Sequence, residues 1–352
     1  MICHLLLILV ACAPVLPGRA VTAQAQTGET SLAPRLKEPR YVSLLGELHS
    51  QYGFSRSELK RLFAQAKFLP EVPEKFAKPA ELMPYNQYRQ IFITPENLAN
   101  ARDYLDRNKA LLQSVEQQYG VDATVIAAIL SVETKFGKRS DGGILVFDAL
   151  NSTFAGVPNR EAFARKELIE FLLLCREEKL DPLTVKGSYA GAMGAPQFIA
   201  SSYRAFAVDF DHDGKRDLWR SEADILGSVA NYLSLHGWQK GAPIRLPVTA
   251  DEQKPEVKLL LAQGISTTAP LERVLGSGVA WAGTAETIDG NPDVSLLVYP
   301  TDAGEQTAVV FPNFRAILSY NHAANYALVV AELQGLLAAP APGPSPASSV
   351  TP

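Results

Sequence analysis

The chain has 352 residues, a length sufficient for two or three domains with their own cores. Apolar residues make up 47% of it and charged residues 20%, proportions typical of a globular protein in water. The formal net charge of −4 argues against nucleic acid as a main partner, because phosphate backbones bind basic surfaces. After the N-terminus, no run of residues is apolar enough over about 18 positions to predict a membrane span.

The first 25 residues have the features of an export signal. An apolar run from Leu5 to Leu16 is followed by Pro17 and Gly18, and an Ala-x-Ala pattern predicts cleavage after Ala25. A competing interpretation is a lipoprotein signal, because Cys12 ends a Leu-Val-Ala-Cys sequence and would then carry a lipid anchor. We favour the soluble exported form.

Residues 26–40 are rich in Thr, Glu and Pro, and we expect a flexible lead-in there. From residue 41 to about 112 the pattern is helical, with interruptions at prolines. A helix is expected to begin at Thr94, which is a good N-cap before Pro95, and to run to about Tyr119.

The stretch from Asp122 to Gly137 is the most informative helix. Asp122 is a suitable N-cap and Gly137 a suitable stop. Apolar residues recur on one helical face, and Glu133 points from the middle of that face. A carboxylate there is costly unless it is paired or protonated, and desolvation raises its pKa, as a general acid requires. A buried structural Glu held by an arginine or by backbone N–H groups is the alternative.

Further helices are expected over residues 163–179 and 223–235, and a glycine-containing loop lies between them at 186–197. Cys175, in the first of these helices, is the only cysteine after the leader, so no disulfide is expected within the mature chain. We interpret it as a small buried hydrophobic residue rather than a nucleophile.

The acidic loop from Asp209 to Asp217 resembles the first part of an EF-hand. Aspartates occupy its positions 1, 3, 5 and 9, and a glycine occupies position 6, where the loop turns sharply. Arg220 stands at position 12 in place of the usual Glu, so Asp224 is expected to close a longer loop. The predicted ligands of a structural Ca²⁺ are Asp209, Asp211, Asp213, the carbonyl of Lys215, and Asp224. A solvated acidic turn is the alternative.

Three stretches together resemble the B-type membrane-bound lytic murein transglycosylases of Gram-negative bacteria, glycoside hydrolase family 103. They are residues 131–137 (SVETKFG), 186–198 (KGSYAGAMGAPQF) and 230–238 (ANYLSLHGW). The similarity covers about residues 41–337, and the second stretch is the most specific of the three.

This resemblance implies an α+β fold that is mainly α, with a lysozyme-like helical core. The resulting organisation is a signal peptide (1–25), the lead-in (26–40), an N-terminal helical domain (41–112), the catalytic core with its EF-hand-like loop (113–242), a small β subdomain (243–311), a C-terminal helix returning to the core (312–338) and a disordered Pro/Ala/Ser tail (339–352). It also implies a periplasmic protein, either soluble or anchored on the periplasmic side of the outer membrane through Cys12. We expect a monomer that binds peptidoglycan glycan strands.

The implied reaction cleaves the β-1,4 bond between N-acetylmuramic acid and N-acetylglucosamine and leaves a 1,6-anhydromuramoyl end. Glycosidases normally use two carboxylates, but only Glu133 is well placed here. Asp141 and Asp148 are the nearest others and read as loop or N-cap residues. The substrate acetamido group would then take the part of the second carboxylate, and no cofactor is expected for catalysis.

Further residues match positions of the family's saccharide groove: Ser188, Gln197, Phe198, Met193, Arg160, Tyr88, Tyr232, Tyr320, Asn321 and Tyr326. Ser188 is implied to contact the acetamido group and Glu133, and its alternative is a hydrogen bond within the loop. Taken singly, the aromatic residues are as readily explained by packing.

The sequence departs from the family pattern at three positions: Asn159, Pro196 and Ser319. Asn159 replaces one of two arginines implied to hold the peptide stem or lactyl group. Two rival functions remain open: a hydrolytic muramidase with a second carboxylate, and a non-catalytic, calcium-stabilised peptidoglycan-binding protein.

Overall fold

The computed structural model describes residues 30–77, 83–139, 143–284 and 287–340. The chain forms two compact units, each built from two segments: Met1–Met83 with Glu133–Tyr232, and Pro84–Val132 with Leu233–Pro352. The predicted signal peptide, Cys12, Asp141 and most of the predicted tail lie outside the described residues. Among the described helices, none is both long and apolar enough to cross a membrane.

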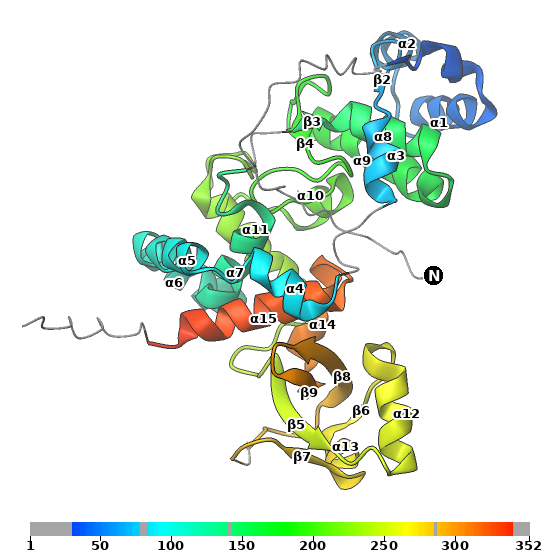
Figure 1. The fold of residues 1–352 in the computed structure, drawn as a ribbon. Coiled ribbons are helices and arrows are strands. Elements are labelled where there is room, and N and C mark those ends of the chain that lie inside the picture. Colours follow the sequence, from blue (N-terminus) through cyan, green and yellow to red (C-terminus); the bar gives the residue numbers. More distant parts are fainter. Residues whose placement is uncertain (1–29, 78–82, 140–142, 285–286, 341–352) are drawn as a thin grey trace, which may run out of the picture. The chain divides into compact units, whose positions relative to one another are not determined.

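The first unit is mainly helical (Figure 1). Its elements are β1 (Thr30–Ser31), η1 (Ala33–Lys37), α1 (Pro39–Ser50), α2 (Arg56–Phe63), β2 (Lys67–Phe68), α3 (Glu71–Phe76), β3 (Ile144–Leu145), α8 (Val146–Gly156), η4 (Pro158–Arg160), α9 (Glu161–Glu177), β4 (Lys186–Gly187) and α10 (Ala200–Phe206). Two more helices, α7 (Ala123–Thr134) and α11 (Glu222–Leu235), have residues in both units. The core of this unit lies around α8, whose residues from Val146 to Phe154 are all buried.

The expected flexible lead-in is ordered over its described part. Strand β1 pairs with β2, and Leu32 donates its N–H to the carbonyl of Ala66. The side chain of Leu32 is fully buried, and burial of a leucine contributes about 2 kcal/mol. Composition predicted flexibility because it does not reveal that a single apolar residue, Leu32, is buried.

The predicted N-terminal domain at 41–112 is divided between the two units. Its first half packs on α8: the ring of Tyr41 lies 5.0 Å from that of Phe154, in an edge-to-face arrangement. Its second half, from Pro84 onward, belongs to the second unit. The sequence does not indicate this division between units, because each unit is assembled from segments far apart in the chain.

The second unit combines helices with one sheet. Its elements are α4 (Tyr85–Tyr88), η3 (Arg89–Ile91), α5 (Pro95–Arg107), α6 (Lys109–Tyr119), β5 (Arg245–Ala250), α12 (Pro255–Gln263), η5 (Gly264–Ser266), β6 (Ala269–Pro270), α13 (Leu271–Gly276), β7 (Val279–Trp281), β8 (Asp293–Thr301), β9 (Gly304–Val310), α14 (Pro312–Tyr320) and α15 (Ala324–Ala338). The five strands follow the order β6-β8-β9-β5-β7, with antiparallel neighbours. They lie within the β subdomain expected at 243–311.

Two helices expected to be continuous are each interrupted. Asn108, with φ −103° and ψ 14°, separates α5 from α6. Asn321 is extended and separates α14 from α15, and its side chain accepts a hydrogen bond from the N–H of Ala323. The Asn108 amide donates to the carbonyl of Tyr104 at 3.1 Å, so at both breaks an asparagine side chain competes with the hydrogen bonds of the helical backbone.

Glu332 on α15 is the centre of a polar network in the second unit. It accepts hydrogen bonds from the hydroxyl of Tyr85 at 2.5 Å and from the guanidinium of Arg89. Burial opposes ionisation of this carboxyl, but the bonds from Arg89 and Tyr85 outweigh it, so its pKa lies below the ordinary value. The network attaches α4 and η3 to α15.

We expect Glu332→Gln to lower the free energy of unfolding by about 2 kcal/mol at pH 7, because a charged hydrogen-bond acceptor is lost. A carboxyl whose pKa is depressed by folding stabilises above its unfolded pKa, so the difference from wild type should shrink below about pH 4. Urea unfolding at several pH values measures both effects. Asp103→Asn is the control: its pair with Arg107 is exposed, and its removal should cost under about 0.5 kcal/mol. Equal losses in the two variants would contradict the role of the network.

Candidate functional site

Glu133 lies in the last turn of α7 and is half-buried. The helix ends at Thr134, earlier than expected, because the next three residues are left-handed: Lys135 has φ 50°, Phe136 has φ 61° and Gly137 has φ 78°. Left-handed backbone costs a non-glycine residue on the order of 1–2 kcal/mol, so other contacts must hold this turn. Glu133 is therefore placed where a helix stops abruptly.

The residues of α7 that precede Glu133 do not form the single apolar face expected from sequence. Every residue from Val125 to Leu130 is fully buried, so the helix is apolar on all sides there. Glu133 differs from these residues because it is a half-buried carboxylate in the last turn of the helix.

Thr134 connects the end of α7 to the loop at 186–198. Its hydroxyl oxygen accepts the N–H of Gly137 at 2.9 Å and donates to the carbonyl of Ala195 at 2.8 Å. Thr134 is only 2% exposed, so both bonds are shielded from water. They fix the residue after Glu133 against the glycine-containing loop.

That loop follows strand β4, which pairs with β3. Gly194 has φ +69°, and a side chain there would approach the carbonyl oxygen of Leu218 to 2.5 Å. The backbone N–H of Ser188 donates to the carbonyl of Ala192 at 2.9 Å, and its hydroxyl accepts the Ala192 N–H at 3.0 Å. The loop hydrogen bond considered for Ser188 is therefore present, and its O–H remains a potential donor.

Three of the expected groove residues shape the end of this loop. Met193 and Phe198 form two backbone hydrogen bonds with each other, and both side chains are buried. Between them, Gln197 is left-handed at φ 53°, and its amide donates to the carbonyl of Gly194 at 2.9 Å. The buried Met193 and Phe198 thus stabilise the loop from its interior side. Gln197 is half-buried, so a ligand can reach it.

Tyr232 packs against this loop from α11. Its ring lies 5.6 Å from that of Phe198 and 4.8 Å from that of Phe206. Burial raises the pKa of its hydroxyl well above the ordinary value, so the tyrosine is neutral at physiological pH. Arg160 is half-buried, with its guanidinium 5.8 Å from the ring centre of Phe76.

The remaining expected groove residues, Tyr88, Tyr320, Asn321 and Tyr326, belong to the second unit. All four are buried. Tyr320 and Tyr326 stack with ring centres 6.4 Å apart and an interplanar angle of 8°. The last three thus form one cluster where α14 meets α15, and their part in a groove stays a prediction.

The rival carboxylate Asp148 has a structural role. It lies in the first turn of α8, is 4% exposed, and accepts the backbone N–H of Lys67 at 2.8 Å. Cys175 is 3% exposed, as expected for a small buried side chain, and burial raises the pKa of its thiol to about 12.

The acidic loop brings three of its predicted ligands together. Carboxylate oxygens of Asp209, Asp211 and Asp213 all lie within 4.8 Å of one another. The N–H groups of Asp213 and Gly214 donate to Asp209 at 3.0 and 2.9 Å, which curls the loop around this cluster. Gly214, with φ +88°, supplies the sharp turn expected at position 6.

Asp224 closes the loop through backbone groups. Its two carboxylate oxygens accept the N–H groups of Phe210 at 2.7 Å and Asp217 at 2.8 Å. Desolvation raises its pKa, and these two hydrogen bonds oppose the rise. Asp224 lies outside the cluster of three, so its role as a metal ligand stays a prediction, as does that of the Lys215 carbonyl.

Two residues that position the site were missed from sequence. Thr134 is one, although its place next to Glu133 was a signal. The other is Glu167 on α9, which is 1% exposed and accepts hydrogen bonds from the N–H and hydroxyl of Ser201 at the start of α10. It lies 34 residues from Ser201, so no local pattern identified it as the helix cap.

Comparison with known proteins gives a family match. A family model described as "Transglycosylase SLT domain" matches residues 37–334. The membrane-bound lytic murein transglycosylase B of Escherichia coli (strain K12) is 35% identical over 305 residues, which cover 84% of this chain and 81% of that relative.

Solved structures of lytic transglycosylases are similar to this chain as well. The soluble lytic transglycosylase SltB1 of Pseudomonas aeruginosa is 36% identical with a TM-score of 0.77, over 85% of this chain and 98% of that one. The Escherichia coli lytic transglycosylase Slt35, solved in complex with calcium, is 33% identical with a TM-score of 0.76, over 85% and 93%. The resemblance drawn from the sequence and the lysozyme-like, mainly helical fold are both confirmed.

We expect Thr134→Val to lower the free energy of unfolding by about 2 kcal/mol, because the Gly137 N–H and the Ala195 carbonyl lose their buried partner. Thr134→Ser, which keeps the hydroxyl, should lose less than half as much. Denaturant unfolding measures both. If the serine variant is as unstable as the valine variant, the methyl group and not the hydroxyl holds the turn.

Proposed function

This chain belongs to the transglycosylase SLT domain family and is a lytic transglycosylase of peptidoglycan, and we propose that Glu133 is its catalytic acid and base. The observation that carries the proposal is the placement of Glu133. It follows the buried residues 125–132 of α7, is half-buried itself, and precedes a threonine hydrogen-bonded to the loop that contains Ser188 and Gln197.

The proposed reaction needs one protein carboxyl group. Glu133 first gives its proton to the glycosidic oxygen between N-acetylmuramic acid and N-acetylglucosamine, so the C1–O bond breaks and the leaving sugar keeps the proton. The acetamido oxygen of the muramic acid bonds to C1 as that bond breaks. Glu133, now ionised, takes the proton of the muramic 6-hydroxyl, whose oxygen attacks C1 and releases the acetamido group.

The product of these steps is a 1,6-anhydro ring, and Glu133 ends protonated for the next turnover. The attacking hydroxyl belongs to the same sugar, which gives it a large effective concentration over water. Ser188, whose O–H can donate, is proposed to orient the acetamido group. Gln197 and Arg160 are proposed to bind the saccharide and its lactyl or peptide substituent.

A hydrolytic muramidase would need a second carboxylate, and Asp148 is a poor one. It is buried in α8 and already accepts a backbone N–H, so it lacks the position of a base for water. A purely binding function is disfavoured because the relatives in this family are lytic transglycosylases.

We also propose export to the periplasm through the signal at residues 1–25, as a monomer, with Cys12 as the alternative lipid-anchor site. The Escherichia coli relative is named as membrane-bound. The intact mass of the mature protein distinguishes cleavage after Ala25 from lipidation of Cys12.

A structural Ca²⁺ is proposed in the acidic loop. Three clustered carboxylates on alternate residues supply the oxygen ligands that calcium prefers, and Slt35 was solved in complex with calcium. The ion would be held by Asp209, Asp211 and Asp213, with the Lys215 carbonyl and Asp224 as further ligands. It would offset the mutual repulsion of these carboxylates and has no step in the reaction.

Glu133→Gln should lower the rate of product release from sacculi by at least about 100-fold, because the amide can neither donate nor accept the proton. Wild type should release anhydromuramoyl ends, which mass spectrometry identifies as one water lighter than hydrolysis products. Glu252→Gln is the control, since Glu252 is an exposed carboxylate between β5 and α12, and it should keep near-wild-type activity. If the wild type releases reducing ends instead, the lyase mechanism is wrong. If Glu133→Gln keeps full activity, Glu133 is not the catalytic acid and base.

Saturating calcium should raise the melting temperature by about 5 °C, and EDTA should reverse the rise, because the ion binds the folded loop alone. Asp209→Asn and Asp213→Asn should each reduce this calcium-dependent shift, whereas Asp181→Asn, in another exposed loop, should keep it. Differential scanning calorimetry measures the calcium-dependent shift in melting temperature. No shift in the wild type would discredit the site.

A further inference from the structure

The first unit contains a pocket of about 440 Å³ that the proposed reaction does not use. Its residues come from the end of α9 and the segment after it, from α10, and from the second half of the acidic loop. Ligand sites typically have volumes of about 300–1,000 Å³, so the pocket is large enough for a small molecule. Lys186, one of its lining residues, begins the strand that leads into Ser188.

The charge of this pocket is opposite to that of the whole chain. Four basic side chains line it against two acidic ones, although the chain has a net charge of −4. Both acidic groups are engaged: Glu178 accepts from Arg216 at 2.7 Å, and Asp217 accepts the N–H groups of Trp219 and Arg220 at 2.9 and 3.0 Å. The pocket therefore carries excess positive charge.

Three of the basic side chains are available to a ligand. Within the part of the chain that the structure describes, Lys186, Lys215 and Arg220 form no ion pair, and all three are exposed. Lysine and arginine in such a setting bind carboxylate or phosphate oxygens through charge-assisted hydrogen bonds.

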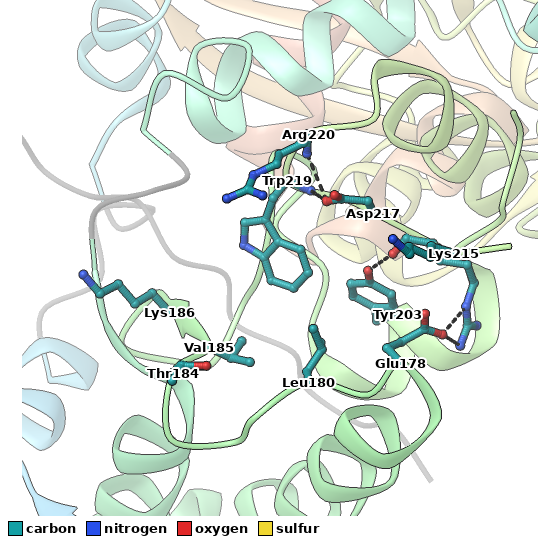
Figure 2. A pocket seen from close by; sticks show the side chains of 11 residues that line it. Glu178, Leu180, Thr184, Val185, Lys186, Tyr203, Lys215, Asp217, Trp219 and Arg220 are labelled. Carbon is teal, nitrogen blue, oxygen red and sulfur yellow. Dashed lines mark hydrogen bonds and ion pairs between the residues drawn. The ribbon is translucent and has the colours of Figure 1, made fainter. Parts of the chain in front are cut away.

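Apart from Thr184, aromatic and apolar side chains form the rest of the pocket (Figure 2). The half-buried indole of Trp219 projects between Arg220 and Leu180, and its ring lies 5.8 Å from that of Tyr203. The hydroxyl of Tyr203 donates to the carbonyl of Arg216, which fixes this ring in place. A ligand that fits has an anionic part and an aliphatic part that packs on the indole.

We propose that this pocket is a second substrate site, which binds the acidic stem peptide of peptidoglycan. This inference rests on the activity on peptidoglycan but not on the role of Glu133. Stem peptides combine free carboxylates with aliphatic side chains, which matches the charged rim and the indole. Lys215 and Arg220 pair with the carboxylates, and Trp219 packs on the aliphatic part.

The test measures binding of N-acetyl-L-Ala-γ-D-Glu-meso-diaminopimelate by isothermal titration calorimetry, with saturating calcium throughout. Lys215→Ala/Arg220→Ala should weaken binding at least tenfold, and Trp219→Ala should also weaken it. Lys60→Ala/Arg61→Ala is the control, because it removes the same charge from two exposed residues on α2, and its affinity should equal that of wild type. Melting temperatures verify that each variant is folded.

A second measurement connects the pocket to turnover. The Lys215→Ala/Arg220→Ala variant should digest sacculi several-fold more slowly than wild type, yet digest amidase-treated glycan, which lacks stem peptides, at the wild-type rate. Equal peptide affinity in this variant and wild type, no binding by wild type, or binding of inorganic phosphate alone would each overturn the proposal. The proposed role of Glu133 is tested separately: it is wrong if the Glu133→Gln variant keeps the wild-type activity.

Discussion

The hydroxyl of Thr134 is the interaction on which the candidate site depends. It accepts the N–H of Gly137 and donates to the carbonyl of Ala195, so one buried oxygen holds the end of α7 and the loop that follows β4. Glu133 is the residue immediately before it. A carboxyl that acts on a bound sugar must be held within a fraction of an ångström, and a buried bond on the adjacent residue provides such precision.

The unusual backbone around Glu133 follows from the same requirement. Lys135 and Phe136 are left-handed without being glycines, and Gln197 is left-handed at the other side of the contact. Strain of this kind persists only where surrounding contacts over-determine the conformation, and it concentrates at functional sites. Here Thr134 and the paired backbones of Met193 and Phe198 provide those contacts.

The acidic loop connects the proposed calcium site to the second pocket. Asp224 accepts the N–H of Asp217, and Asp217 in turn accepts the N–H groups of Trp219 and Arg220, which line the pocket. A metal bound at Asp209, Asp211 and Asp213 would therefore stabilise the segment that positions Trp219. In this proposal the ion would have a structural part in substrate binding and none in the chemistry.

The sequence by itself determined the family, the mainly helical α+β class and the turn at Gly214, because each depends on residues close together in the chain, and it predicted Glu133 as the acid. It predicted helices through Asn108 and Asn321, since periodicity is blind to a side chain that competes with the backbone. Only the tertiary structure decided that Leu32 anchors the lead-in, that residues 41–112 divide between two units, and that Thr134 meets Ala195. These depend on contacts between residues tens of positions apart, and no local pattern encodes which distant partner a buried polar or apolar group will find.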